Sequence, residues 1–318
     1  MEISVVIPLF NEEESLIELH NWIVKSLKKA NYTFEIIFID DGSTDQSWDI
    51  IENLSSSHNY TYGIRLAKNY GKSQALNAGF KFAKGKFVAT LDADLQDSPE
   101  EIPLMIKEIK NRNLDLISGW KKKRFDSFFL KNIPSKLFNW AARFVSGIKL
   151  NDFNCGIKVY KNKVIKTIDV RGEMHRYIPV LASEAGFKKI SEKEVVHQSR
   201  KYGYTKFGPE RFINGFLDLI TIWFLKKFGK RPMHFFGLWG TLMFIIGLAF
   251  TTYLGVDKLF FNPQSRLITD RPHFYIALVT MIVGVQFFIA GFIGEVLIRN
   301  NNYKINYIIS NTTSNYED

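Results

Sequence analysis

Cysteine is almost absent from the 318-residue sequence, which contains Cys155 alone. A single cysteine excludes an internal disulfide and is consistent with a reducing compartment. The sequence also lacks internal repeats, and its one biased segment is the polar tail at 311–318, which we expect to be disordered. The chain start lacks the basic residues of a signal peptide, because Met1 and Glu2 lead directly into a strand-like run that ends at Pro8. We therefore expect the first domain to stay in the compartment where it is made.

Acidic and basic residues are absent from two long stretches near the end of the chain. Residues 234–256 contain no Asp, Glu, Lys or Arg, and neither do residues 273–294, which precede Glu295. Each stretch is long enough to span about 30 Å of hydrocarbon as a helix. Two buried helices of a soluble domain are the alternative, but adjacent uncharged runs of this length are rarely core. We predict a transmembrane hairpin at 233–299, with spans at about 234–256 and 273–297.

Basic residues flank this predicted hairpin on both sides, and the loop between the spans balances three basic residues with two aspartates. The flanking residues are Lys226, Lys227, Lys230, Arg231, Arg299 and Lys304. Because basic residues are retained on the cytoplasmic side, both ends of the hairpin and the tail at 300–318 are expected in the cytoplasm.

Two further segments, at about 128–146 and 209–232, combine aromatic, apolar and basic residues. Basic, aromatic-rich amphipathic helices lie in the headgroup plane of a membrane. Ordinary packing against a core is the alternative; the interface is favoured for 209–232, which leads directly into a span, while both readings of 128–146 stay open. The formal net charge of +10 suits an anionic partner, which could be nucleic acid, a phosphorylated substrate or an acidic membrane surface. Acidic lipid explains basic residues beside apolar segments better than nucleic acid does, so we expect no nucleic-acid partner.

Strand-like and helix-like patterns alternate over the first part of the chain. We expect strands at 3–7, 34–39, 62–66, 87–91 and 114–118, and helices at 12–29, 43–54, 72–83 and 99–109. This alternation predicts an α/β domain with a mostly parallel sheet covered on both faces. Ligands of such sheets bind beyond the carboxyl ends of the strands. Asp40-Asp41 and Asp92-Ala93-Asp94 both follow strands and should therefore face one crevice.

The segment Asp92-Ala93-Asp94-Leu95-Gln96-Asp97 is the sharpest candidate site. Two carboxylates two residues apart can ligate one Mg²⁺ or Mn²⁺ ion, which commonly shares its ligands with substrate phosphates. Such an ion neutralises a diphosphate leaving group. A solvated loop is the alternative for this pattern taken alone.

A second candidate is Asp40-Asp41-Gly42-Ser43, followed by Asp45. A carboxylate at a strand end can accept hydrogen bonds from a nucleobase or a ribose, and Gly42 permits a tight turn. A helix N-cap would explain Ser43 and Asp45, but it does not need two further aspartates.

Together with Pro8-Leu9-Phe10-Asn11-Glu12, these two segments resemble in order and spacing the inverting family 2 glycosyltransferases of GT-A (Rossmann-like) fold. Later motifs narrow the resemblance to the dolichol- and polyprenyl-phosphate sugar transferases. They are Lys131-x-x-x-Ser135, Asp152-Phe153-Asn154-Cys155-Gly156, Gly172-Glu173-Met174-His175-Arg176-Tyr177 and Arg200-x-x-Gly203-x-Thr205-Lys206.

The resemblance covers about residues 3–232, and a two-span tail fits bacterial members of the family. It implies a GT-A domain at 1–208, a juxtamembrane amphipathic helix at 209–232, the transmembrane hairpin and a cytoplasmic tail. It also implies an integral protein of the bacterial inner membrane, with the catalytic domain in the cytoplasm.

The resemblance further implies roles for individual residues. Asp92, Asp94 and Gln96 would hold Mg²⁺ or Mn²⁺, and Lys131 with Ser135 would bind the lipid phosphate. The catalytic candidates are Asp94, Asp152 and Arg200. The nucleotide-sugar would be bound by Pro8, Phe10, Glu12, Asp41, Asp92, Ala93, Asp94, Gln96, Lys121, Arg200 and Lys206.

Three positions of the resemblance carry qualifications. Lys121 and Lys131 stand where relatives often have arginine, and lysine lacks the bidentate fork of a guanidinium. His175-Arg176 has two readings, a contact to sugar or phosphate near the acceptor, or a turn of surface helix.

The implied reaction is inverting transfer of a sugar from a UDP- or GDP-linked donor to polyprenyl phosphate, such as undecaprenyl phosphate. The product would serve cell-envelope glycan or glycoprotein modification. A phosphate monoester has a second pKa of about 6, so the acceptor is already largely dianionic at neutral pH and needs no general base. Lys121, Lys131 and Arg200 would offset the repulsion between the two anionic substrates.

The sequence disfavours two alternatives to this reaction. A processive polysaccharide synthase should carry a Gln-x-x-Arg-Trp motif and more spans, which are missing. A non-catalytic paralogue should not retain Asp41, Asp92, Asp94 and Arg200 together. A homo-oligomer is compatible with all of these features.

Overall fold

The computed structural model describes residues 1–122, 139, 142–143, 146–170, 172, 174–199, 201–202, 217, 224, 227–228, 231–264, 266–300 and 309–312. The chain divides into two compact units. The first contains residues 1–220 together with 305–318, and the second contains residues 221–304. Each unit is described separately below.

The first unit is built on one eight-stranded sheet with the strand order β7-β5-β6-β4-β1-β2-β3-β8. The strands are β1 (Ile3–Leu9), β2 (Phe34–Asp40), β3 (Thr61–Leu66), β4 (Phe87–Thr90), β5 (Leu116–Trp120), β6 (Lys158–Lys161), β7 (Ile190–Glu194) and β8 (Ile309–Thr312). Neighbouring strands are parallel except where β6 meets β4 and β5, and where β8 meets β3. The prediction of an α/β fold with a mostly parallel sheet is therefore confirmed.

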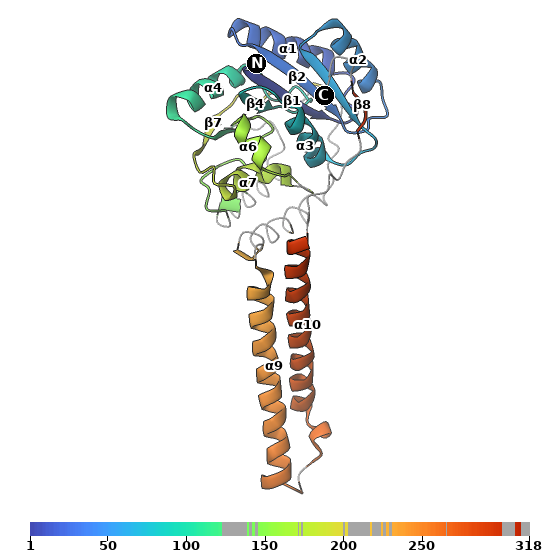
Figure 1. Cartoon of the computed structure of the whole chain (residues 1–318), viewed down its shortest axis with the longest axis vertical. Helices are drawn as coiled ribbons and strands as arrows, with labels where there is room; N and C mark the ends of the chain where they lie inside the picture. Colours follow the sequence, from blue (N-terminus) through green and yellow to red (C-terminus); the bar gives the residue numbers. More distant parts are fainter. Residues whose placement is uncertain are drawn as a thin grey trace. The chain divides into compact units, whose positions relative to one another are not determined.

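Helices cover both faces of this sheet because its central strands bury their side chains on both sides. Every residue of β1 and β2 is buried. Val5 and Ile7 pack into one core with α1 (Leu16–Lys29), α2 (Ser47–Ser57) and α4 (Glu101–Arg112). Val6 packs into the opposite core with α3 (Lys72–Phe82), α6 (Asn162–Thr167) and α7 (Ile178–Glu184). A short 3-10 helix, η2 (Met174–Tyr177), leads into α7. Figure 1 shows these helices around the sheet.

The C-terminal tail contributes the edge strand β8, which runs antiparallel to β3. Thr312 lies opposite Ile64, and Asn311 lies opposite Arg65. The expectation of a disordered tail at 311–318 is therefore wrong for residues 311 and 312. An edge strand such as β3 presents unpaired backbone N–H and C=O groups, and pairing with even a short polar segment satisfies them. Residues 313–318 lie outside the described part of the chain.

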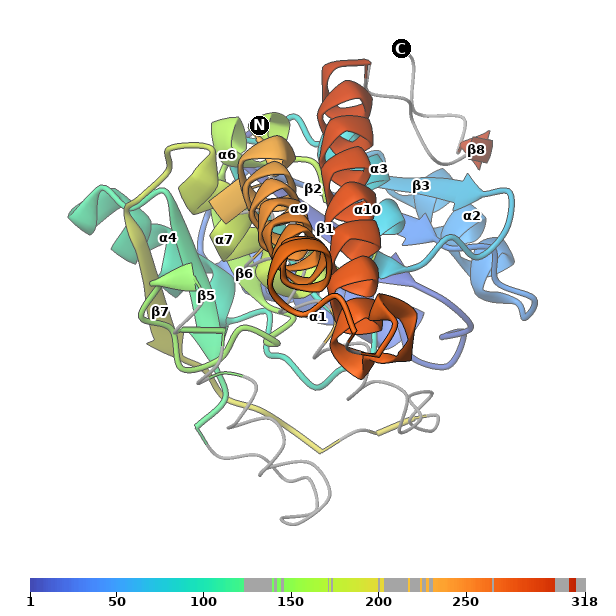
Figure 2. The ribbon, with the colours of Figure 1, turned by 90° about the horizontal axis from the view of Figure 1, so that it is seen from below.

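The second unit is a helical hairpin. α9 (Pro232–Val256) continues into a π-helical turn at Asp257–Phe261, and a loop with a 3-10 turn at Ile268–Asp270 leads into α10 (Pro272–Asn300). Figures 1 and 2 both show α9 and α10 side by side. The segments Pro232–Phe261 and Pro272–Leu297 are long and apolar enough to cross a membrane. In each segment, only 17% of an apolar 18-residue stretch is buried. Such exposure differs from that of core helices in a soluble protein, which are mostly buried.

Glycine allows the two helices of the hairpin to approach closely. A Cβ atom at Gly240 would lie 2.5 Å from the carbonyl oxygen of Gly284, and one at Gly284 would lie 2.6 Å from the carbonyl oxygen of Gly240. Small residues at helix contacts favour association in membranes, where van der Waals packing replaces the hydrophobic effect. The segments predicted to be interfacial, 128–146 and 209–232, fall mostly outside the described residues.

Candidate active site

The loops that follow β1 and β2 are held together by side chain to backbone hydrogen bonds. Asn11 takes a left-handed conformation with a φ of 54°. Its backbone N–H donates to Ser43 Oγ at 2.9 Å, and its own Oδ1 accepts from the Thr44 N–H at 2.8 Å. The predicted nucleoside-binding segments 8–12 and 40–45 therefore lie beside each other, as their positions at neighbouring strand ends require.

Asp41 organises the turn that precedes α3. Its two carboxylate oxygens accept the backbone N–H groups of Tyr70 and Gly71, each at 2.8 Å. The side chain is almost fully buried, and burial raises the pKa of Asp41 to about 6, although the two backbone donors act in the opposite direction. Asp41 thus fixes the start of α3, and its predicted contact with the nucleoside remains a prediction.

The segment 92–97 alternates between exposed and buried side chains. Asp92, Asp94 and Gln96 are partly exposed, while the residues between and after them, Ala93, Leu95 and Asp97, are at most 4% exposed. The sequence-predicted metal ligands therefore share the accessible side of the segment. Leu95 holds a left-handed φ of 58°, an unfavourable conformation for a leucine that often marks a functional loop.

Asp92 is ionised and fixed in position by its neighbours. Burial acts to raise its pKa, but Lys72, Lys121 and Lys158 together lower it to about 2. Lys72 Nζ lies 2.5 Å from Asp92 Oδ1. On the other side, the Gly156 backbone approaches so closely that a Cβ atom there would lie 2.6 Å from Asp92 Cγ.

The accessible groups of this segment fit a divalent cation. Mg²⁺ and Mn²⁺ prefer oxygen ligands, and Mg²⁺ is usually bound by one or two carboxylates together with substrate phosphates. Asp92 and Asp94 would supply carboxylates to such an ion, and Gln96 would supply an amide oxygen. The described residues contain no group of three His, Cys, Asp or Glu side chains that would form a cage from protein alone.

Lys121, a predicted donor ligand, lies in a buried ion pair. Its Nζ is 2.7 Å from Asp97 Oδ1, with Lys121 13% exposed and Asp97 1% exposed. Burial would raise the pKa of Asp97, but Lys121 lowers it below its usual range. His197 approaches the same carboxylate, with its Nδ1 3.8 Å from Asp97 Oδ1. Lys121 thus has a partner within the chain, and its contact with the donor stays a prediction.

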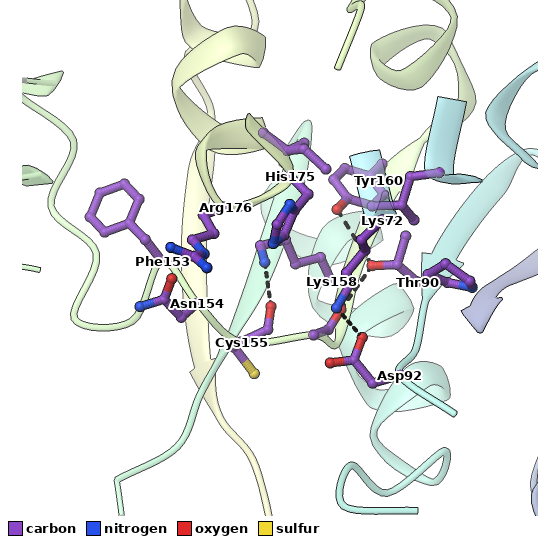
Figure 3. A pocket seen from close by; sticks show the side chains of 14 residues that line it. Lys72, Thr90, Asp92, Phe153, Asn154, Cys155, Lys158, Tyr160, His175 and Arg176 are labelled. Atoms are coloured by element: carbon purple, nitrogen blue, oxygen red, sulfur yellow. Dashed lines mark hydrogen bonds and ion pairs between the residues drawn. The ribbon is translucent and has the colours of Figure 1, made fainter. Parts of the chain in front are cut away.

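A pocket of about 320 Å³ lies directly beside Asp92. Figure 3 shows its polar side chains, which come from α3, the end of β4, the segment 153–158 and η2. They include Lys72, Asp92, Asn154, Lys158, His175 and Arg176. Neither Lys72 nor Lys158 was singled out from the sequence. A lysine inside the apolar run Ile157–Tyr160 was the only signal for Lys158.

His175 and Arg176 face this pocket, so the reading of this pair as a turn of surface helix is wrong. Arg176 is 8% exposed. The Nδ1 atom of His175 lies 3.2 Å from Ser73 Oγ. Burial, with Lys72 and Arg176 nearby, lowers the pKa of His175 well below its ordinary value, so the imidazole is neutral.

Asp152 shapes the loop that forms one wall of the pocket. It is 1% exposed, and its Oδ1 accepts the backbone N–H of Asn154 at 3.0 Å. Its predicted catalytic role stays a prediction. Four other sequence-predicted site residues, Lys131, Ser135, Arg200 and Lys206, lie outside the described residues.

Comparison with known proteins identifies relatives along nearly the whole chain. The sequence model of glycosyl transferase family 2 matches residues 4–169. A dodecaprenyl-phosphate galacturonate synthase of Rhizobium johnstonii is 34% identical over 314 residues, which cover 97% of this chain and 92% of that protein. An undecaprenyl-phosphate 4-deoxy-4-formamido-L-arabinose transferase of Proteus mirabilis is 33% identical over 302 residues, covering 95% and 90%.

Solved structures share the fold at lower identity. Glucosyl-3-phosphoglycerate synthase from Mycobacterium tuberculosis, in complex with Mn²⁺, UDP-glucose and phosphoglyceric acid, has a TM-score of 0.52 and 18% identity, covering 69% of this chain and 80% of that chain. The family match includes the strands that carry both aspartate segments and the β6 wall of the pocket. The chain therefore belongs to glycosyl transferase family 2.

Proposed function

We propose that the chain transfers a sugar, with inversion, from a UDP- or GDP-linked donor to polyprenyl phosphate, giving a polyprenyl-phosphate-linked sugar. The observation that carries the proposal is the accessible row Asp92, Asp94 and Gln96 beside a basic pocket, in a chain whose relatives are polyprenyl-phosphate sugar transferases. Both relatives are matched over at least 90% of their own length, which includes their regions beyond the transferase domain.

The donor is assigned to the carboxyl ends of β1, β2 and β4. The turn that Asp41 holds at Tyr70 and Gly71 would form a wall for the nucleoside. Asp92, Asp94 and Gln96 would hold Mg²⁺ or Mn²⁺, which would supply positive charge to stabilise the departing diphosphate. Lys72 keeps the Asp92 carboxylate in place and adds positive charge on the same side. The solved relative that binds Mn²⁺ with UDP-glucose supports this arrangement.

The acceptor phosphate supplies its own nucleophile. With a second pKa of about 6, a phosphate monoester is largely dianionic at neutral pH, and one of its oxygens can attack the anomeric carbon in line. The neutral His175 is placed near the reaction but is not needed as a base. We assign Lys131 and Ser135 to the lipid phosphate and Arg200 with Lys206 to closure over the phosphates.

The hairpin would place this reaction at a membrane surface. α9 and α10 are apolar and exposed, and a prenyl chain requires the same hydrocarbon environment. Residues 1–220 and the strand β8, which follows α10, belong to the same sheet-containing unit. If both helices span, the two ends of the hairpin therefore lie on one side of the membrane, which we assign to the cytoplasm of a bacterial cell.

The test is transfer by the purified full-length protein. The protein is incubated with Mg²⁺ or Mn²⁺, a panel of UDP- and GDP-sugars and undecaprenyl phosphate, and the lipid product is weighed by mass spectrometry. We expect one glycosyl unit per lipid phosphate, loss of the product on chelation, and loss in Asp92→Asn. Asp49→Asn, at an exposed position on α2, is the matched control. Hydrolysis of the donor without a lipid product would contradict the proposal.

A further inference from the structure

A buried guanidinium without an internal acceptor lines the pocket beside Asp92. Arg176 is 8% exposed, and among the described residues its guanidinium has no ion pair and no hydrogen bond. An arginine is always charged and presents five N–H donors. Burying such a group is costly unless it is paired, so a bound anion beside Arg176 would stabilise the site.

A second cation lies in the same pocket. Lys158 is 4% exposed, and its Nζ donates to the backbone carbonyl of Cys155. Asp92 and Asp152 are the carboxylates that interact electrostatically with Lys158. Neither forms an ion pair with Lys158 within the described part of the chain. Asp92 is paired with Lys72 instead. The pocket wall therefore carries three cationic side chains and one carboxylate.

An acceptor without a donor completes the pocket. Asn154 Oδ1 is buried and has no hydrogen-bond partner among the described residues. Figure 3 shows the Asn154 amide and the Arg176 guanidinium on the same side of the pocket. A buried carbonyl oxygen requires an O–H or N–H donor from a ligand. A ligand that satisfies both groups carries an oxyanion and a hydrogen-bond donor.

We propose that the transferred sugar is a sugar acid, whose carboxylate is bound by Arg176 and Lys158 and one of whose hydroxyls donates to Asn154 Oδ1. The planar guanidinium of Arg176 matches a carboxylate in a bidentate geometry. This inference rests on the proposed transferase function.

The two other anions of the reaction fit these groups less well. The lipid phosphate is largely dianionic at neutral pH and then has no hydroxyl to donate to Asn154. The donor diphosphate also lacks a hydroxyl, and its place is beside the cation ligands on the accessible side of the segment 92–97. A sugar acid supplies both the oxyanion and the hydroxyl from one compact group.

The test compares acidic donors with their neutral counterparts. UDP-glucuronate, UDP-galacturonate and GDP-mannuronate are each offered with the matching neutral nucleotide-sugar to the full-length protein, with Mn²⁺ and undecaprenyl phosphate. We expect one acidic donor to be transferred with the highest kcat/KM of the panel. In Arg176→Gln the preference for that donor over its neutral partner should fall by roughly 30-fold or more, as for loss of one member of a buried charge pair. Arg176→Lys keeps the positive charge but loses the bidentate guanidinium. Its preference for the acidic donor should therefore lie between that of the wild type and that of Arg176→Gln.

Arg112→Gln, which removes an exposed arginine on α4, is the control and should leave the preference unchanged. Preferred transfer of a neutral sugar would overturn the inference and leave the proposed function standing. So would an Arg176→Gln variant in which KM for the lipid phosphate rises and the donor preference stays the same. If no donor is transferred to lipid at all, the proposed function itself fails.

Discussion

Replacing Gly156 with alanine should displace the Asp92 carboxylate without unfolding the domain. The added Cβ would lie 2.6 Å from Asp92 Cγ and Oδ2, whereas ordinary contacts begin at 3.4 Å, so one side must move by about 0.8 Å. The Gly156 backbone is held by Thr90, whose Oγ1 donates to the Gly156 carbonyl oxygen at 2.9 Å. The Asp92 carboxylate is partly exposed, so we expect the carboxylate to move and the Gly156 backbone to stay in place.

The expected loss follows from that displacement. A misplacement of about 1 Å in a catalytic group costs up to ~10²-fold in rate, and we expect kcat for sugar transfer to fall by ~10- to 100-fold. The concentration of Mn²⁺ needed for half-maximal activity should rise as well, because Asp92 is an assigned ligand. The melting temperature should change little, since the carboxylate can swing toward solvent and the backbone of Gly156 does not have a positive φ.

The assay is the initial rate of sugar-lipid formation at several Mn²⁺ concentrations, together with thermal unfolding. Gly255→Ala is a matched control, because a Cβ atom there meets nothing within 4 Å. Unchanged kcat and unchanged Mn²⁺ dependence in a folded Gly156→Ala protein would refute the reasoning that ties Asp92 to the cation.

Four further predictions address the cation site, the acceptor, pH and topology. Asp94→Asn should abolish transfer while circular dichroism and melting temperature stay unchanged; normal turnover would remove Asp94 from the cation site. Lys131→Ala should raise KM for the lipid phosphate or lower turnover, and loss of donor affinity instead would move Lys131 to the nucleotide side. Because burial raises the pKa of Asp41 from 3.8 to about 6, wild-type stability falls as the pH rises between these two values and changes no further above pH 6 on this account. The melting temperature of Asp41→Asn relative to wild type should therefore increase from pH 4 to pH 6 and then level off, and a flat difference would contradict the shift. Cys155 is buried, so a maleimide should label only cysteines that are added by mutation. Gln264→Cys should react from outside the cell, and Asp318→Cys should react only after permeabilisation. The reverse pattern would show the opposite topology.

The first part of the fold was predictable because its signals are local. The strands from Ile3 to Trp120 have long apolar runs, and the intervening helices repeat apolar residues at helical spacing. Strands β6 and β7 were not predicted. They have four and five residues, and β7 is mostly polar, so neither shows a clear period. β8 is a strand only because β3 offers it an open edge, and such a tertiary effect overrides local propensity.

The candidate site was predictable in part for the same reason. Asp92, Asp94 and Gln96 are spaced two residues apart, so their shared accessible side follows from the local chain. The partners of Asp92 come from elsewhere: Lys72 is 20 residues earlier, and Gly156 belongs to the other wall of the pocket. The burial of Arg176 follows from the packing of η2 against α3 and α7, which no short sequence pattern contains.

The antiparallel pairing of β8 with β3 also constrains the order in which the protein is completed. β3 is made early and β8 is made last, after both helices of the hairpin, so the outer edge of β3 stays open throughout synthesis. Open strand edges promote association between chains. Closing this edge requires that α10 has already returned the chain to the side of the domain. Completion of the sheet therefore depends on the hairpin having formed, and a chain that stops before β8 keeps an aggregation-prone edge.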